Sequence, residues 1–143
     1  MELSYNQSLE LALKKLNDLF KGDIVFVAGV SEYKRGIKES KPNDIDVVIT
    51  TLKPLIRNHI TYGMRPNEKG NRFKGIGIIP DFEGFKIEIF YGTQLPEYDV
   101  IDNLKYQTVE DSIKYYKETL DLYPEDHRET IKNRIKILEN TIY

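Results

Sequence analysis

One short run of residues constrains the fold more than any other part of the chain. Five apolar residues, Ile24 to Ala28, follow one another between Gly22 and Gly29. A short apolar run that is rich in β-branched and aromatic residues and bounded by glycine is typical of a strand buried on both faces. The sequence therefore predicts a buried strand over residues 23–30, in a sheet that other elements cover.

Helical patterns stand on both sides of this run. Apolar residues recur at spacings of four, three and four, once before the run and twice near the C-terminus, and this spacing places them on one stripe of a helix. Ser4 or Asn6 is suited to cap the first helix, and Thr108 with Asp111 the second. The break at residues 122–124 predicts an antiparallel helical hairpin over about 108–142. The three stripes are Leu9, Leu13, Leu16 and Phe20; Val109, Ile113, Tyr116 and Leu120; and Ile131, Ile135, Leu138 and Ile142.

Further strands are expected over 44–51, 72–79 and 85–91, with a five-residue hairpin connection at 80–84. Between the first two we expect a short helix after Pro54 and then irregular chain around Gly63, Pro66 and Gly70. The order of helix, strands and helices predicts one α/β (α+β) domain over residues 1–143. Its mixed twisted sheet has an N-terminal helix and a C-terminal helical hairpin.

Composition excludes several kinds of chemistry. The chain has 143 residues, no cysteine and two histidines. This composition excludes thiolate metal sites, thiol nucleophiles and His-rich metal sites. The formal net charge of −2 argues against a protein that wraps nucleic acid by bulk electrostatics. We find neither a signal-peptide pattern nor a run of about 18 apolar residues, and therefore expect a cytoplasmic domain without a membrane partner.

Asp44 and Asp46 flank Ile45 at the start of the strand predicted over 44–51. Side chains alternate between the two faces of a strand, so the two carboxylates point to the same side. Two short carboxylates that converge repel each other unless a divalent cation lies between them, and oxygen ligands favour Mg²⁺ or Mn²⁺. The alternative interpretation is a turn acid followed by the solvated face of a half-buried strand.

A third acid favours the cation. Glu88 interrupts the apolar strand around Ile87 and Ile89. Glutamate is disfavoured in strands and costly to bury unpaired. It therefore lies either on a solvated face or beside a cation.

The region from Ile24 to Tyr91 resembles the nucleotidyltransferase superfamily of DNA polymerase beta. The features that carry the resemblance are Gly29 at the end of a strand, a basic connection, the Asp44-Ile45-Asp46 motif and the later Glu88. The small pair of the family motif is either Ala28-Gly29 or Gly29-Val30 with Ser31 displaced by one. The resemblance implies the mixed sheet of that superfamily, with the core motif over residues 24–91.

The resemblance also implies an activity. In the family, two metal ions bridge the paired acids and the incoming NTP, and a third acid helps to activate the acceptor hydroxyl; pyrophosphate is released. Asp44, Asp46 and Glu88 match these catalytic and metal-binding acids, with Mg²⁺ or Mn²⁺ as the cofactor. Gly29 and Ser31 match the turn whose backbone amides approach the triphosphate.

Other candidate nucleotide contacts can equally be explained as ordinary solvated or core residues. Basic residues of the connection after Gly29 could neutralise phosphate charge, although basic residues in a loop are usually only solvated; they are Lys34, Arg35, Lys38 and Lys41. A tyrosine of the C-terminal helical part could stack on a base, but such residues more often belong to the core.

Three functions remain open. The first is a metal-dependent transferase that moves a nucleoside monophosphate from an NTP, ATP among them, to a hydroxyl of a small molecule, a protein or an RNA. The second is a catalytically silent module that binds a nucleotide or a protein partner, as antitoxin-like family members do. The third has the acids on a wet sheet face with no site. A stripe of the C-terminal helices left uncovered would suit a protein partner or a homodimer.

Overall fold

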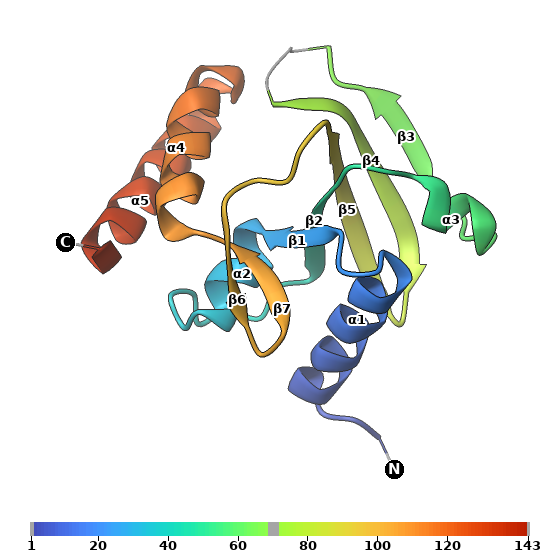
Figure 1. The fold of residues 1–143 in the computed structure, drawn as a ribbon. Helices are drawn as coiled ribbons and strands as arrows, with labels where there is room; N and C mark the ends of the chain where they lie inside the picture. Colours follow the sequence, from blue (N-terminus) through green and yellow to red (C-terminus); the bar gives the residue numbers. More distant parts are fainter. Residues whose placement is uncertain (1, 69–71, 143) are drawn as a thin grey trace.

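The structure of the chain is a computed structural model that describes residues 2–68 and 72–142. The chain begins with a helix, ends with two long helices and carries its strands between them, as the sequence predicted (Figure 1). The elements are α1 (Tyr5–Leu19), β1 (Ile24–Val27), α2 (Ala28–Lys34), β2 (Asp44–Ile49), α3 (Lys53–Arg57), β3 (Gly63–Pro66), β4 (Phe73–Phe82), β5 (Phe85–Gly92), β6 (Tyr98–Ile101), β7 (Leu104–Gln107), α4 (Val109–Thr119), the 3₁₀ turn η1 (Leu120–Leu122) and α5 (Glu125–Ile142).

Within the described residues, seven strands form one sheet in the order β3-β4-β5-β2-β1-β7-β6. The sheet is mixed: β2 pairs in parallel with β5 and β1 with β7, whereas the other neighbours are antiparallel. The strands that carry the family motif, β1, β2 and β5, are therefore central and flanked on both sides. This confirms the predicted fold class, a mixed sheet with an N-terminal helix and a C-terminal helical hairpin.

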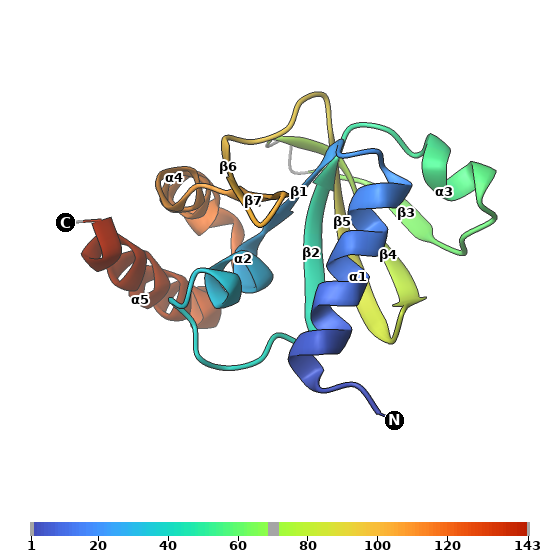
Figure 2. The same ribbon diagram turned by 60° about the horizontal axis from the view of Figure 1, so that its bottom comes forward.

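Helix α1 covers one face of the sheet (Figure 2). It begins at the predicted cap Ser4, whose hydroxyl accepts from the Gln7 amide while the Gln7 side chain accepts from the Ser4 amide. Its apolar stripe packs against alternate residues of the central strands, Ile45, Val47 and Ile49 among them. Because these three face α1, the intervening residues of β2 project from the opposite face of the sheet.

The opposite face is covered only in part. Helices α4 and α5 lie side by side as the predicted hairpin and share their own apolar cluster (Figure 1). Tyr115 of α4 extends that packing onto the sheet, where it meets Val27, Val48 and Phe73. The part of this face beyond Val48, toward the start of β2, holds the acidic residues.

Two predicted boundaries are wrong. The strand expected over 23–30 ends at Val27, because Ala28 takes a left-handed conformation (φ 55°) and α2 begins there. The hairpin expected to use five residues turns within two, Glu83 and Gly84, because the chain stays paired through Phe82. Positive φ at both turn residues matches the right-handed twist of the flanking strands.

Three strands were not predicted. β3 lies where irregular chain was expected around Gly63 and Pro66, while Gly70 falls outside the described residues. β6 and β7 form a hairpin in the segment left without an assignment between Pro96 and Thr108. Short strands of this kind are fixed by their neighbours rather than by their own sequence pattern.

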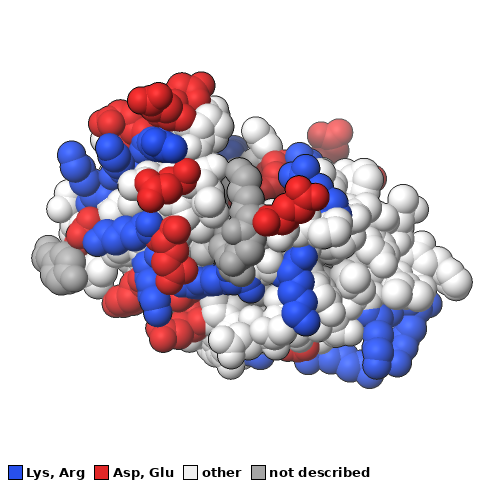
Figure 3. Space-filling model, turned by 90° about the horizontal axis from the view of Figure 1, so that it is seen from above, with Lys and Arg blue, Asp and Glu red and all other residues white. Residues whose placement is uncertain are grey.

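None of the helices in the described part of the chain combines the length and the apolar character needed to cross a membrane. Acidic and basic side chains are interspersed over the face seen in Figure 3, in keeping with the small net charge.

Candidate active site

The pairing of β2 with β5 brings three carboxylates to one place. Asp44 and Asp46 project from β2 on the face opposite α1, whereas Ile45 between them is fully buried. Asp46 is the register partner of Glu88, and partners in adjacent parallel strands point to the same face. The three acids therefore meet on one face of the sheet, although 42 residues separate Asp46 from Glu88 in the sequence.

The environment of Asp46 disfavours its charged form. The pKa of Asp46 is raised to about 8, first by burial, then by Glu88 as a hydrogen-bond partner and as a charge, and then by the charge of Asp44, while the nearby Arg134 opposes the shift. One carboxylate oxygen, Oδ1, is buried without a hydrogen-bond partner. A buried, unpartnered carboxylate oxygen beside two more carboxylates suits a bound cation.

Lys86 partly compensates the other two acids. Its ammonium lies 3.9 Å from Asp44 Oδ2 and 3.7 Å from Glu88 Oε1. The pKa of Asp44 is raised by burial, lowered by Lys86 and raised again by Glu88. As the side chains stand, no group of three or more His, Cys, Asp or Glu residues in the described ranges is arranged to hold a metal ion. A cation at this site would have to displace the Lys86 ammonium, which sits on a flexible, 42% exposed side chain.

The donor chemistry of the site nevertheless fits a hard divalent cation. All the donors are carboxylate oxygens. The side chains of Asp44 and Glu88 are about one third exposed, so an ion could reach them from solvent. The residues Asp44, Asp46 and Glu88 are those that would hold it. Their metal-binding and catalytic roles stay predictions.

The junction between β1 and α2 lies next to these acids, since Val27 is the register partner of Asp46. The residue in the left-handed conformation is Ala28, not Gly29 as the predicted glycine turn would have it. Gly29 is buried in the first turn of α2, and a Cβ atom there would lie 3.3 Å from Lys38 Nζ and 3.8 Å from Arg134 Nη2. Gly29 thus leaves room next to two cationic groups.

The other predicted nucleotide contacts have partners within the protein. The buried Ser31 hydroxyl donates to the Gln107 carbonyl at 3.3 Å. Lys34 forms an ion pair with Glu10 of α1. Arg35 pairs with Asp99 of β6 at 2.9 Å and also donates to the carbonyls of Tyr106 and Gln107. The structure therefore brings Gly29 near the acids but directs Ser31, Lys34 and Arg35 to other elements.

Sequence reasoning missed a buried ion pair beside the site. Arg134 of α5 donates from Nε and Nη2 to the two carboxylate oxygens of Glu32 in α2, each at 2.8 Å, and the Tyr116 hydroxyl lies 3.4 Å from the same carboxylate. Glu32 is only 5% exposed. One sequence signal was available: Arg134 stands within the apolar stripe of its helix, between Ile131 and Leu138, where a charged residue needs a partner.

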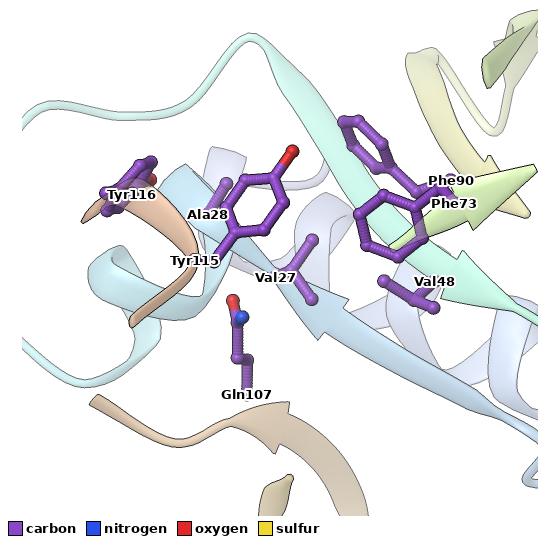
Figure 4. Close-up of a pocket in the computed structure, with 8 residues that line it drawn as sticks. All are labelled: Val27, Ala28, Val48, Phe73, Phe90, Gln107, Tyr115 and Tyr116. Atoms are coloured by element: carbon purple, nitrogen blue, oxygen red, sulfur yellow. The ribbon is translucent and has the colours of Figure 1, made fainter. Parts of the chain in front are cut away.

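A small apolar cavity adjoins the acids on the same face (Figure 4). Its volume of about 30 Å³ is room for one or two water molecules. The Tyr115 ring projects from α4 toward the strand residues Val27 and Phe73, and burial raises the pKa of its hydroxyl to about 12. Tyr115 lines the cavity and belongs to the core, which is the alternative to base stacking that the sequence offered for the C-terminal tyrosines.

Comparison with known proteins finds solved structures with a similar fold but no similar sequence among family models or curated proteins. No protein-family model and no curated protein matches the chain. Two solved structures of ANT(2'')-Ia, an aminoglycoside adenylyltransferase, are similar at a TM-score of 0.53 and 12% identity. The structure in complex with adenylyl-2''-tobramycin is matched over 96% of this chain and 97% of that one. The solution structure, described as that of an antibiotic-resistance factor, is matched over 98% and 92%.

The crystal structure of JHP933 from Helicobacter pylori is matched at 18% identity and a TM-score of 0.49, over 80% of this chain and 57% of that one. The chain thus spans little more than half the length of JHP933. The likeness to ANT(2'')-Ia covers nearly the whole of both chains, and the mixed sheet with its N-terminal and C-terminal helices is consistent with it. The chain therefore has the nucleotidyltransferase fold that the resemblance of its sequence implied.

Proposed function

We propose that the protein is a metal-dependent nucleotidyltransferase that moves a nucleoside monophosphate from an NTP to an acceptor hydroxyl. The observation that carries the proposal is the register of β2 against β5, which sets Asp46 beside Glu88 and leaves Asp46 Oδ1 buried and unpartnered. The fold supports it, since an adenylyltransferase shares that fold over nearly its full length.

The proposed reaction is a single displacement at phosphorus. The acceptor oxygen bonds to the α-phosphorus, the bond from that phosphorus to the bridging oxygen breaks, and pyrophosphate leaves with the bonding electrons. In this proposal Glu88, whose side chain is 36% exposed, would take the proton of the acceptor hydroxyl and pass it to solvent. Mg²⁺ or Mn²⁺ held by Asp44, Asp46 and Glu88 would supply positive charge against the phosphate oxygens.

The acceptor is proposed by analogy. The ANT(2'')-Ia structure contains adenylyl-2''-tobramycin, a nucleotidylated small molecule. This chain matches 97% of ANT(2'')-Ia, so its size is compatible with a small-molecule acceptor. A hydroxyl of a protein or of an RNA remains the alternative acceptor.

One observation favours a second function, a module that binds nucleotide without turnover. The Lys86 ammonium lies between Asp44 and Glu88, where a cation would otherwise sit. A protein that keeps this arrangement would bind the phosphates of a nucleotide without assembling a metal centre.

The test uses each of the four NTPs labelled at the α-phosphate, with Mg²⁺ or Mn²⁺ and with aminoglycosides or cell extract as the source of acceptors. We expect label to appear on an acceptor with the wild-type protein, and Asp46→Asn and Glu88→Gln to reduce the rate by at least roughly 100-fold. Asp126→Asn is the control, because that carboxylate is 82% exposed on α5, where it lies 3.9 Å from His127 Nε2. Transfer that survives Asp44→Ala combined with Asp46→Ala would refute the proposal, and nucleotide binding that persists in EDTA without transfer would support the module.

A further inference from the structure

Two cationic side chains from distant parts of the chain meet beside Gly29. Lys38 lies in the connection between α2 and β2, and Arg134 lies on α5, which runs beside that connection (Figure 2). A methyl group at Gly29 would contact both, at 3.3 Å from Lys38 Nζ and 3.8 Å from Arg134 Nη2. The two charges therefore face one shared space, next to the strand end that is paired with Asp46.

The charge in this space is not balanced. Arg134 is matched by Glu32, whose two oxygens both accept from it. Lys38, which is half-buried, has no carboxylate within 4.0 Å among the residues that the structure describes. A lysine held beside a half-buried arginine without a counter-ion of its own adds an excess of positive charge, and an anion between them would relieve the repulsion.

Solvent reaches both cations. They line an open depression of about 350 Å³ between α5 and the connection after α2, together with the polar side chains of Thr130 and Asn133. That volume falls at the lower end of the range for small-molecule sites. Arg134 also lies close enough to Asp46 for its charge to lower the pKa of that carboxyl, so the depression and the acids are electrostatic neighbours.

We infer that Lys38 and Arg134 form an anion site that takes the polyphosphate chain of the nucleotide, with Glu32 as the positioning residue that holds Arg134. The inference rests on the proposed function for the identity of the nucleotide, but the anion site itself stands on the geometry around Gly29. Lys38 would donate from a point charge, and Arg134 would present Nη2, which faces Gly29 and carries a second N–H besides the one that it donates to Glu32. Of the basic residues that the sequence offered for phosphate contact, the inference keeps Lys38, and it adds Arg134 in place of Lys34 and Arg35.

The test measures binding of inorganic tripolyphosphate by calorimetry, in EDTA, so that no metal takes part. We expect Lys38→Ala to weaken binding roughly tenfold, the value of one charge-assisted hydrogen bond. Lys136→Ala is the matched control, since it removes the same charge from an exposed position two residues beyond Arg134 on α5.

Gly29→Ala is a second probe that does not remove a charge. The new methyl group would displace the end of the Lys38 side chain, while alanine suits a helix better than glycine. We expect stability in urea to be kept or slightly increased and tripolyphosphate affinity to fall several-fold.

The outcomes separate this inference from the proposed function. Equal affinity in wild type and Lys38→Ala, an equal loss in Lys136→Ala, or no binding by the wild type would overturn the anion site, even if Asp46→Asn abolishes nucleotidyl transfer. A loss confined to Lys38→Ala and Gly29→Ala would support it, even if no NTP is ever transferred.

Discussion

Asp46 is the residue whose chemistry depends most on its surroundings. It lies between Asp44 and Glu88 on the acidic face of the sheet, and burial first, then Glu88 and Asp44, raise its pKa to about 8. A carboxyl whose pKa is higher in the folded than in the unfolded protein binds more protons when folded. Without metal, its contribution to stability is therefore complete below about pH 4 and is lost as the pH rises toward 8.

Asp46→Asn should therefore stabilise the metal-free protein at pH 8, by on the order of 2 kcal/mol, because the amide cannot ionise in the buried position. The gain should shrink as the pH falls to 5, where the wild-type carboxyl is protonated. Urea denaturation at both pH values, in EDTA, measures it, and Asp126→Asn should change neither value. A variant that is less stable than the wild type at pH 8 would show that the carboxylate has a favourable partner within the protein.

The three acids could be brought together from the sequence, whereas the meeting of the two cations could not. Alternation along β2 fixes the common side of Asp44 and Asp46, and the family motif indicates Glu88. Lys38 is one of four basic residues that the sequence offers for phosphate contact, but Arg134 carries no comparable pattern. Their meeting at Gly29 depends on how α5 packs against the rest of the chain, and 102 residues separate Arg134 from its partner Glu32.

At the scale of elements, predictability followed length and periodicity. Helices α1, α4 and α5 and strand β2 have long regular patterns or clear caps, and the sequence located them. The four-residue strands β3, β6 and β7 are too short for a pattern. The β6–β7 turn also lacks glycine: Asp102 and Asn103 both take positive φ.

Helix α5 is fastened to α2 by the Glu32–Arg134 pair, so breaking that pair should loosen the helical hairpin. Arg134→Ala leaves Glu32, 5% exposed, without its partner and should cost about 3 kcal/mol of unfolding free energy. Replacing both residues by leucine should recover most of that loss, because an apolar pair leaves no buried charge. Urea denaturation of the single and double variants measures the difference; a cost below about 1 kcal/mol for Arg134→Ala would mean that the pair does not anchor the helix.

On the scale of the whole molecule, the two faces of the sheet have different roles: one is packed into the core, and the other carries the acidic residues. Helix α1 seals one face with apolar contacts, while α4 and α5 cover the other face only in part and leave the acids at the edge of the covered area. The cations Lys38 and Arg134 border the acids on the side of α5, next to the start of α2. Opposite charges thus flank one region of an otherwise mixed surface, an arrangement suited to a ligand that carries both metal and phosphate.

Metal and proton should compete for this region, which couples the stability of the whole protein to both. Because Mg²⁺ needs the ionised carboxylates, its apparent affinity should fall roughly tenfold for each pH unit below 8, where Asp46 gains its proton. At a fixed Mg²⁺ concentration the thermal midpoint should therefore rise more at pH 8 than at pH 6, and EDTA should reverse the rise. The increase should vanish in Asp46→Asn and Glu88→Gln and persist in Asp126→Asn. An equal increase at both pH values, or one that survives Asp46→Asn, would place the Mg²⁺ elsewhere on the protein and leave the acidic face without a metal.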